Sequence, residues 1–270
     1  MAKNKDFTFD DLNKQLADLN PLGSIMETSN FSKVTDWIHT GNYHLNACVS
    51  GSLFKGWPNN RSSSIAGPSG TGKTFLMLNT VREAIDKGYS VIYYDSEAAV
   101  DKEQMEKFGI DVTKVNYQPI NTVQEFRTSV TAITDVLIEQ KAKGIALPKI
   151  MVVLDSAGNL ATQKEIDDAR SGSEKADMTR SKVLKSIFRI IMTPLADLKI
   201  PFIFTNHTYQ TQDFIDSISG IAYGNSKVLV GWQDTLYEFD GSTTHNPDAA
   251  NYTQAYYNIF SEYGMSSQYI

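Results

Sequence analysis

The chain has 270 residues, of which 41% are hydrophobic and 11% aromatic, so it can bury one substantial core and is neither disordered nor fibrous. Its single cysteine, Cys48, excludes an intrachain disulfide framework, and its 4 histidines show no zinc-ligand spacing. The net charge of −6 is concentrated in residues 209–270, where one basic residue faces seven acidic ones. No secretory leader or membrane-spanning apolar run is recognisable, so we expect a soluble, cytoplasmic protein without a membrane partner.

The first predicted element is a short amphipathic helix over residues 7–20, which ends at Pro21 and leads into a linker. We assign residues 1–40 to this N-terminal helical segment. The helix is expected to dock either on a neighbouring protomer or on its own core.

Strand-like and helix-like segments then alternate along the chain. The predicted strands are 61–66, 90–94, 115–117, 149–155 and 201–206, and the predicted helices are 75–87, 101–109, 122–144 and 176–198. Thr122 and Glu125 form a capping-box pattern at the start of one long helix. The alternation predicts an α/β fold with a mostly parallel sheet and helices on both faces.

Residues 67–74 fill every position of the phosphate-loop pattern G-x-x-x-x-G-K-[ST], between a predicted strand and a predicted helix. Inward-facing backbone amides and the start of the following helix favour a polyphosphate there. We therefore expect ATP and Mg²⁺ to bind, with Lys73 at the β- and γ-phosphates and Thr74 as a metal ligand. The predicted nucleotide-binding residues are Gly67, Pro68, Ser69, Gly70, Thr71, Gly72, Lys73 and Thr74.

Three further strand ends carry residues suited to the same chemistry, because ligands bind outside the carboxyl ends of parallel strands. Asp155 follows the most apolar strand and is predicted to orient Mg²⁺ through a water molecule. Glu97 is predicted to position the attacking water, with Asp95 an equal competitor on spacing alone. His207, after Asn206, is either a γ-phosphate sensor or a residue that caps a strand end.

Five motifs follow one another in a specific order: the phosphate loop, Tyr94–Glu97, Leu154–Leu160, Asp177–Lys182 and Thr205–Tyr209. In this order they resemble RecA-type recombinases, most closely the UvsX-like branch from bacteriophages. The strings Asp-Ser-x-Gly-Asn-Leu and Asn-His-Thr-Tyr are the specific ones, since generic phosphate-loop ATPases such as hexameric helicases do not share them in this combination. The similarity covers about residues 35–212.

The resemblance implies a RecA-like P-loop NTPase core over residues 41–226. It assigns catalysis to Glu97 in preference to Asp95. The predicted catalytic residues are therefore Glu97, Lys73 and His207. The resemblance also implies that His207 links the γ-phosphate to a DNA-binding loop. Gln104 stands where such recombinases often place a tyrosine against adenine.

The implied activity is that of a DNA-dependent ATPase that forms helical homo-oligomeric filaments on single-stranded DNA and promotes strand exchange in recombination and repair. Two loops, near 167–177 and 208–226, would face the DNA. The implied DNA-binding residues are Arg170, Lys175, Arg180, Lys182 and Phe214. A recombination mediator or a single-stranded-DNA-binding protein would be a further partner.

Residues 227–270 depart from the resemblance, because relatives carry several basic residues there that reach the neighbouring ATP and this segment has only Lys227. We assign it to a separate acidic C-terminal segment, with strands expected at 227–232, 235–239 and 252–260. A truncated or out-of-frame coding segment is one hypothesis for it. Two other functions therefore stay open: a catalytically impaired ATP-binding fragment or mediator, and a RecA-fold helicase motor.

Overall fold

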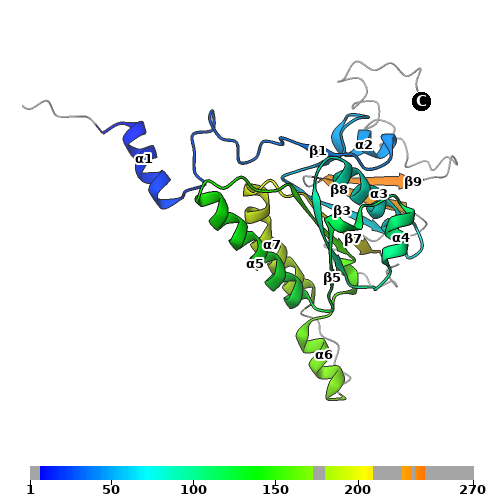
Figure 1. The fold of residues 1–270 in the computed structure, drawn as a ribbon. Coiled ribbons are helices and arrows are strands. Elements are labelled where there is room, and N and C mark those ends of the chain that lie inside the picture. Colours follow the sequence, from blue (N-terminus) through cyan, green and yellow to red (C-terminus); the bar gives the residue numbers. More distant parts are fainter. Residues whose placement is uncertain (1–6, 173–179, 209–226, 233–234, 241–270) are drawn as a thin grey trace, which may run out of the picture.

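A seven-stranded sheet runs through the computed structural model, which describes residues 7–172 and 180–208 and the backbone of 227–232 and 235–240 (Figure 1). In spatial order its strands are β5 (Val115–Pro119), β4 (Ser90–Asp95), β6 (Ile150–Asp155), β7 (Phe202–His207), β3 (Ser62–Gly67), β8 (Lys227–Trp232) and β9 (Thr235–Asp240). The five strands from β5 to β3 are parallel, whereas β8 pairs antiparallel with β3 and with β9. The predicted mostly parallel sheet is confirmed.

Helices cover both faces of this sheet, as predicted (Figure 1). α5 (Val123–Ala142) and α7 (Arg180–Asp197) lie side by side on one face. α3 (Lys73–Asp86) covers the other face, with α2 (Tyr43–Ser50) and α4 (Lys102–Lys107) beside it. Each face has its own cluster of buried apolar residues, one built around α3 and the other around α5 and α7.

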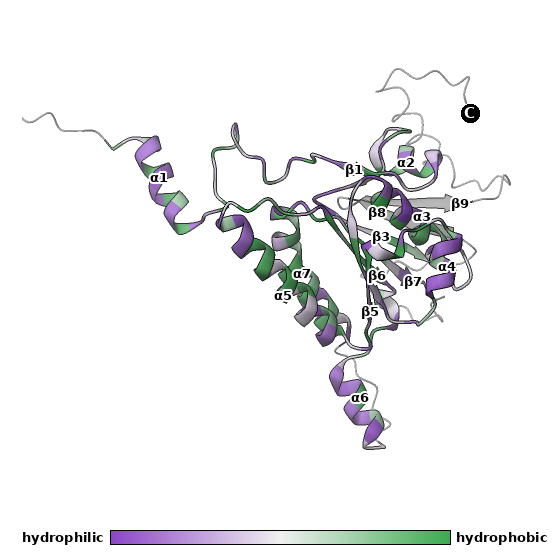
Figure 2. Ribbon diagram, viewed as in Figure 1, coloured by the Kyte–Doolittle hydropathy of each residue, from purple (hydrophilic) through white to green (hydrophobic). Residues whose placement is uncertain are grey.

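Several short elements were not predicted. They are the strands β1 (Trp37–Ile38) and β2 (Trp57–Pro58), the helices α2 and α6 (Gln163–Arg170), and the 3₁₀ turns η1 (Val112–Lys114) and η2 (Ala157–Asn159). Because α6 continues to Arg170, the start of the expected DNA-facing loop 167–177 is helical, which corrects that boundary. Figure 2 shows α6 as a predominantly hydrophilic helix that extends away from the sheet, and none of its residues is buried.

The N-terminal helix α1 (Phe9–Leu19) forms where it was predicted and buries none of its residues. After it, the chain crosses the amino end of the sheet, where Lys199 donates hydrogen bonds to the carbonyls of Asn30, Phe31 and Lys33. No helix in the described part of the chain is long and apolar enough to span a bilayer.

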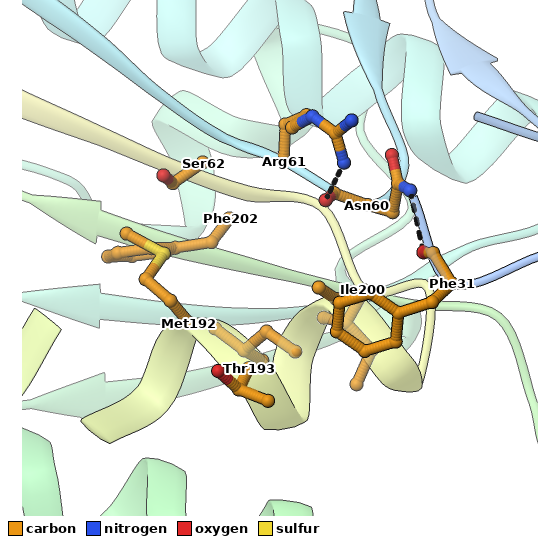
Figure 3. A pocket seen from close by; sticks show the side chains of 10 residues that line it. Phe31, Asn60, Arg61, Ser62, Met192, Thr193, Ile200 and Phe202 are labelled. Atoms are coloured by element: carbon orange, nitrogen blue, oxygen red, sulfur yellow. Dashed lines mark hydrogen bonds between the residues drawn. The ribbon is translucent and has the colours of Figure 1, made fainter. Parts of the chain in front are cut away.

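The segment between α1 and β1, residues 20–36, is called the N-terminal arm below. A cavity of about 260 Å³ lies under this arm, between Phe31 and the last turns of α7 (Figure 3). Its walls include Asn60, Arg61 and Phe202, which stand at or beside the amino ends of β3 and β7. The phosphate loop follows the carboxyl end of β3. The cavity and the predicted nucleotide site therefore occupy opposite ends of the sheet.

The sheet extends beyond the predicted core boundary at residue 226. β8 and β9 form at the two positions where strands were predicted in the C-terminal segment, and β8 hydrogen-bonds to β3. The expected strand at 252–260 lies outside the described residues.

Candidate active site

The phosphate loop connects the carboxyl end of β3 to the N-terminus of α3, the arrangement that the sequence pattern requires. Gly70 and Gly72 adopt φ angles of 78° and 84°, in the left-handed region where glycine is favoured. A side-chain carbon built on either glycine would meet nothing within 4 Å, so the loop opens onto unfilled space. A bulky anion can therefore approach the loop backbone.

Lys73 is the first residue of α3 and its side chain is folded back over the loop. Its ammonium donates hydrogen bonds to the carbonyls of Gly67 at 3.1 Å and Pro68 at 2.8 Å. Desolvation lowers the pKa of Lys73, while the negative charges of Glu97 and Asp155 oppose this shift. An ammonium with three donors in a desolvated setting is suited to exchange its carbonyl partners for phosphate oxygens.

Asp155 ends β6 and is 3% exposed. Its Oδ2 accepts a hydrogen bond from the Tyr93 hydroxyl at 2.9 Å, and its Oδ1 accepts one from the Thr205 hydroxyl. A carboxylate has about four lone-pair sites, so these two bonds fix its orientation and leave capacity for a water molecule. This fits the predicted water-mediated role toward Mg²⁺.

The two competing carboxylates at the end of β4 have different surroundings. Asp95 is 3% exposed and uses both oxygens, accepting from the Glu97 amide at 2.8 Å and from the Tyr117 hydroxyl at 2.9 Å. Glu97 is partly exposed, and its Oε1 lies 2.5 Å from the Ser156 hydroxyl that donates to it and 2.7 Å from His207 Nε2. Glu97 is therefore the carboxylate that faces the site, while Asp95 holds the backbone amide of Glu97.

His207 ends β7, the strand between β6 and β3, and is the register partner of Gly67. Its Nε2 approaches Glu97 and its Nδ1 lies 3.5 Å from the Lys73 ammonium. With a proton on Nε2 the ring can donate to the carboxylate, while Nδ1 faces the ammonium. The structure thus brings Lys73, His207 and Glu97 into one continuous chain of polar contacts.

The charge state of Glu97 follows from these neighbours. Partial burial alone would raise the pKa of its carboxyl group. The hydrogen bonds from Ser156 and His207 and the positive charge of Lys73 outweigh that effect, so the pKa is lowered. Glu97 is therefore ionised at neutral pH and able to accept a hydrogen bond.

The other predicted site residues are distributed more widely. Gln104 lies in the first turn of α4, which packs beside α3 through the edge-to-face rings of Phe108 and Phe75, 5.2 Å apart. Thr74 follows Lys73 at the start of α3. Within the described residues there is no cluster of three or more His, Cys, Asp or Glu side chains able to hold a metal ion.

Three of the predicted DNA-binding residues fall within the described residues. Arg170 is exposed at the end of α6, and Lys182 is exposed in the first turn of α7. The guanidinium of Arg180 instead donates to the carbonyl of Leu160 at 2.8 Å and to that of Gly158. Lys175 and Phe214, with the segments 173–179 and 209–226, lie outside the described residues.

Sequence reasoning missed the residues that hold the carboxylates: Tyr93, Tyr117, Ser156 and Thr205. For two of them the sequence carries a usable signal. Tyr93 precedes Asp95 by two residues and Thr205 precedes His207 by two, so each lies on the same face of its strand as a predicted site residue. Tyr117 was not recoverable in this way because its place beside Asp95 depends on the pairing of β5 with β4.

Comparison with known proteins yields a consistent set of matches. The family model described as the RecA N-terminal domain matches residues 7–231, a longer stretch than the predicted 35–212. The recombination and repair protein of Enterobacteria phage T4 is 30% identical over 199 residues, covering 73% of this chain and 49% of that protein.

Bacterial relatives match less closely. Protein RecA of Malacoplasma penetrans (strain HF-2) is 27% identical over 176 residues, which are 65% of this chain and 48% of that protein. Protein RecA of Streptomyces ambofaciens is 27% identical over 211 residues, 77% of this chain and 50% of its own length. In each case the match spans about half the length of the relative.

Proposed function

Because the chain belongs to the RecA family, we propose that it binds ATP with Mg²⁺ at residues 67–74 and hydrolyses it in response to single-stranded DNA. The observation that carries this proposal is the chain of contacts from Lys73 through His207 to Glu97. These residues lie at the carboxyl ends of β3, β7 and β4, and Asp155 lies beside them at the end of β6. A site with a loop for phosphate, a cation, an ionised carboxylate and a buried second carboxylate suits phosphoryl transfer to water.

In this proposal the phosphate loop binds the triphosphate through its backbone amides and Lys73, and Gln104 lies toward the base. Thr74 and, through a water molecule, Asp155 would hold Mg²⁺. The metal would neutralise charge that builds up between the β- and γ-phosphates. Asp155 suits that role because its two hydroxyl partners fix its orientation without using all its lone pairs.

Glu97 is proposed to accept a hydrogen bond from the attacking water. Its lowered pKa keeps it ionised, and its partial exposure leaves it open to the site. Asp95 is the weaker candidate for direct contact with the attacking water because it is 3% exposed and its Oδ1 accepts from the backbone amide of Glu97, whereas the Glu97 side chain is partly exposed. His207 contacts both Glu97 and Lys73, which supports a role as the sensor of the γ-phosphate.

The proposed DNA activity is the formation of filaments on single-stranded DNA that promote strand exchange. The relatives support it, since one is a recombination and repair protein and the others are RecA proteins. Arg170, Lys175, Arg180, Lys182 and Phe214 are the proposed DNA contacts. Arg180 would have to exchange the carbonyls of Gly158 and Leu160 for phosphate oxygens. A mediator or a single-stranded-DNA-binding protein is the proposed further partner.

The test measures ATP turnover by the purified chain with and without single-stranded DNA, and nucleotide affinity with a fluorescent ATP analogue. We expect DNA to stimulate turnover. Lys73→Ala should abolish nucleotide binding, and Glu97→Gln should retain binding while turnover falls by about 100-fold or more. Lys107→Ala and Glu103→Gln make the same chemical changes at exposed positions of α4 and should leave both quantities unchanged.

The outcomes separate the competing functions. Binding without turnover in the unaltered chain would contradict the ATPase proposal and favour a nucleotide-binding mediator. Turnover coupled to duplex unwinding by a closed ring would favour a helicase motor. Equal turnover with and without DNA would remove the DNA-dependent part of the proposal.

A further inference from the structure

Two tyrosines lie side by side beneath the carboxylates of the proposed active site. Tyr93 on β4 and Tyr117 on β5 are register partners in the sheet, and their rings are stacked with centroids 6.5 Å apart. Each hydroxyl donates to a different aspartate at 2.9 Å: Tyr93 to Asp155 and Tyr117 to Asp95. One stacked pair of rings thus holds two carboxylates of adjacent strands.

The two aspartates are themselves register partners, on β4 and β6. Each also contacts a second group through its other oxygen. The second oxygen of Asp155 is held by the Thr205 hydroxyl. The second oxygen of Asp95 accepts from the backbone amide of Glu97. A fixed Asp95 therefore fixes the backbone from which the Glu97 side chain extends into the site.

Tyrosine is suited to this task for an electrostatic reason. A carboxylate that is 3% exposed needs donors for its oxygens, and an unsatisfied one is costly. Desolvation and the bond to Asp95 raise the pKa of Tyr117 to about 12, so its hydroxyl remains a donor at any physiological pH. Phenylalanine would fill the same space and leave Asp95 with one bond fewer.

We propose that Tyr117 and Tyr93 are positioning residues for ATP hydrolysis, Tyr117 by fixing Glu97 through Asp95 and Tyr93 by fixing Asp155. The inference rests on the proposed function of this site. Tyr117 acts on the residue that orients water, so its loss lowers the rate of the chemical step and leaves nucleotide affinity intact. Tyr93 acts on the residue assigned to Mg²⁺, so its loss raises the Mg²⁺ concentration needed for half-maximal turnover.

The chain offers a matched control at the other end of the same sheet. Tyr89, just before β4, donates to Asp36 Oδ2 at 2.9 Å, so Tyr89→Phe removes the same kind of tyrosine–carboxylate bond far from the site. Tyr117 is 41% exposed, which makes Tyr117→Phe the variant least able to disturb folding. Thermal unfolding midpoints of all variants report on folding separately from turnover.

The experiment measures kcat, the KM for ATP and the Mg²⁺ dependence of the unaltered chain first, then of the three phenylalanine variants. We expect Tyr117→Phe to lower kcat by about tenfold, the value of one lost hydrogen bond, with KM changed less than about twofold. Tyr93→Phe should shift the Mg²⁺ midpoint upward, and Tyr89→Phe should change none of the three quantities.

Three results would overturn the inference alone. They are an unchanged kcat in Tyr117→Phe, an unchanged Mg²⁺ midpoint in Tyr93→Phe, and an equal loss of kcat in Tyr89→Phe, which would point to general destabilisation. Absence of turnover in the unaltered chain would instead remove the proposed function and this inference together. The failure of the inference is therefore distinguishable from the failure of the function on which it rests.

Discussion

His207 has a distinct position among single residues because it touches both charged partners of the site. Its ring lies between the Lys73 ammonium and the Glu97 carboxylate, with Nδ1 facing the first and Nε2 the second. A phosphate oxygen that draws Lys73 away would change the partner of one ring nitrogen. The other nitrogen would carry that change to Glu97, so the ring is suited to report nucleotide state.

We predict that His207→Gln supports DNA-stimulated ATP turnover within about fivefold of the unaltered chain, because a side-chain amide also carries a donor group and an acceptor group. His207→Ala, which offers neither, should keep nucleotide affinity and lose stimulation by DNA. Turnover with and without single-stranded DNA, set beside nucleotide affinity, checks both variants. Retained stimulation in His207→Ala would show that the ring only completes the end of β7.

At this scale the sequence predicted which residues meet but not how each is held. The phosphate loop, Asp155, Glu97 and His207 were recoverable because each sits at a strand end or in a motif. The choice between Asp95 and Glu97 was even on spacing. The hydroxyl of Tyr117, which holds Asp95, lies there because of strand register and not because of any local pattern.

Among the elements, the helix start at Thr122 is the clearest case in which local sequence dictates structure. Thr122 Oγ1 accepts from the Glu125 amide at 3.0 Å, and Glu125 Oε2 accepts from the amides of Thr122 and Asn121, each at 2.9 Å. The capping box was predicted and is confirmed. Helix α5, which it opens, buries five residues against the sheet and α7, so fraying there would expose core.

We predict that Thr122→Ala lowers the free energy of unfolding by about 1–2 kcal/mol, since it removes an N-cap acceptor at a buried position. Thr122→Ser should recover most of the loss. Thr162→Ala removes the matching capping box of α6. Thr162 is as buried as Thr122, but α6 itself buries no residue and α5 buries five, so the loss of global stability should be smaller. Urea unfolding of the three variants gives the comparison; an equal loss in Thr122→Ala and Thr162→Ala would contradict it.

The elements that sequence reasoning missed share a cause. β1 and β2 are two residues long, too short for a period-two pattern, and they pair only because Gly56 lets the backbones approach. A side-chain carbon at Gly56 would lie 2.2 Å from the Ile38 carbonyl oxygen. Such elements are created by tertiary contact and have no sufficient local signal.

At the scale of the whole molecule, the proposed active site and the contacts that hold the N-terminal arm lie at opposite ends of one sheet. The carboxyl ends of β3, β4, β6 and β7 carry the proposed active site. The amino ends are crossed by the N-terminal arm, which is held by Lys199 and by Asn60. The side-chain amide of Asn60 donates to the carbonyl of Phe31 (Figure 3) and to that of Lys33. The parallel core was predictable from alternating strands and helices, whereas the pairing of β8 with β3 had no local signal.

Asp36 forms the ion pairs that connect the N-terminal arm to the core. Its carboxylate lies 2.5 Å from Lys87 Nζ at the end of α3 and 3.0 Å from Lys149 Nζ before β6, and it also accepts from Tyr89. Burial by itself would raise the pKa of Asp36, but these three donors and the backbone amide of Trp37 outweigh it and lower the pKa to about 2. The ionised form is therefore favoured by folding.

The sign of the resulting pH dependence follows from linkage. A carboxyl group whose pKa is lower in the folded chain stabilises it fully above the unfolded value of 3.8, and the contribution disappears as pH falls through about 2. Because the group is partly exposed and screened, we expect a contribution of about 1 kcal/mol, less than the whole pKa difference would give.

Asp36→Asn should lower the unfolding free energy by that amount at neutral pH, with the difference shrinking between about pH 4 and pH 2. Asp86→Asn, which removes the same charge from an exposed position at the end of α3, should not show this convergence. Urea unfolding across this pH range measures the free energy of unfolding of both variants and of the unaltered chain. A loss of unfolding free energy in Asp36→Asn that is equal at every pH would mean that the carboxylate acts through packing and not through its charge.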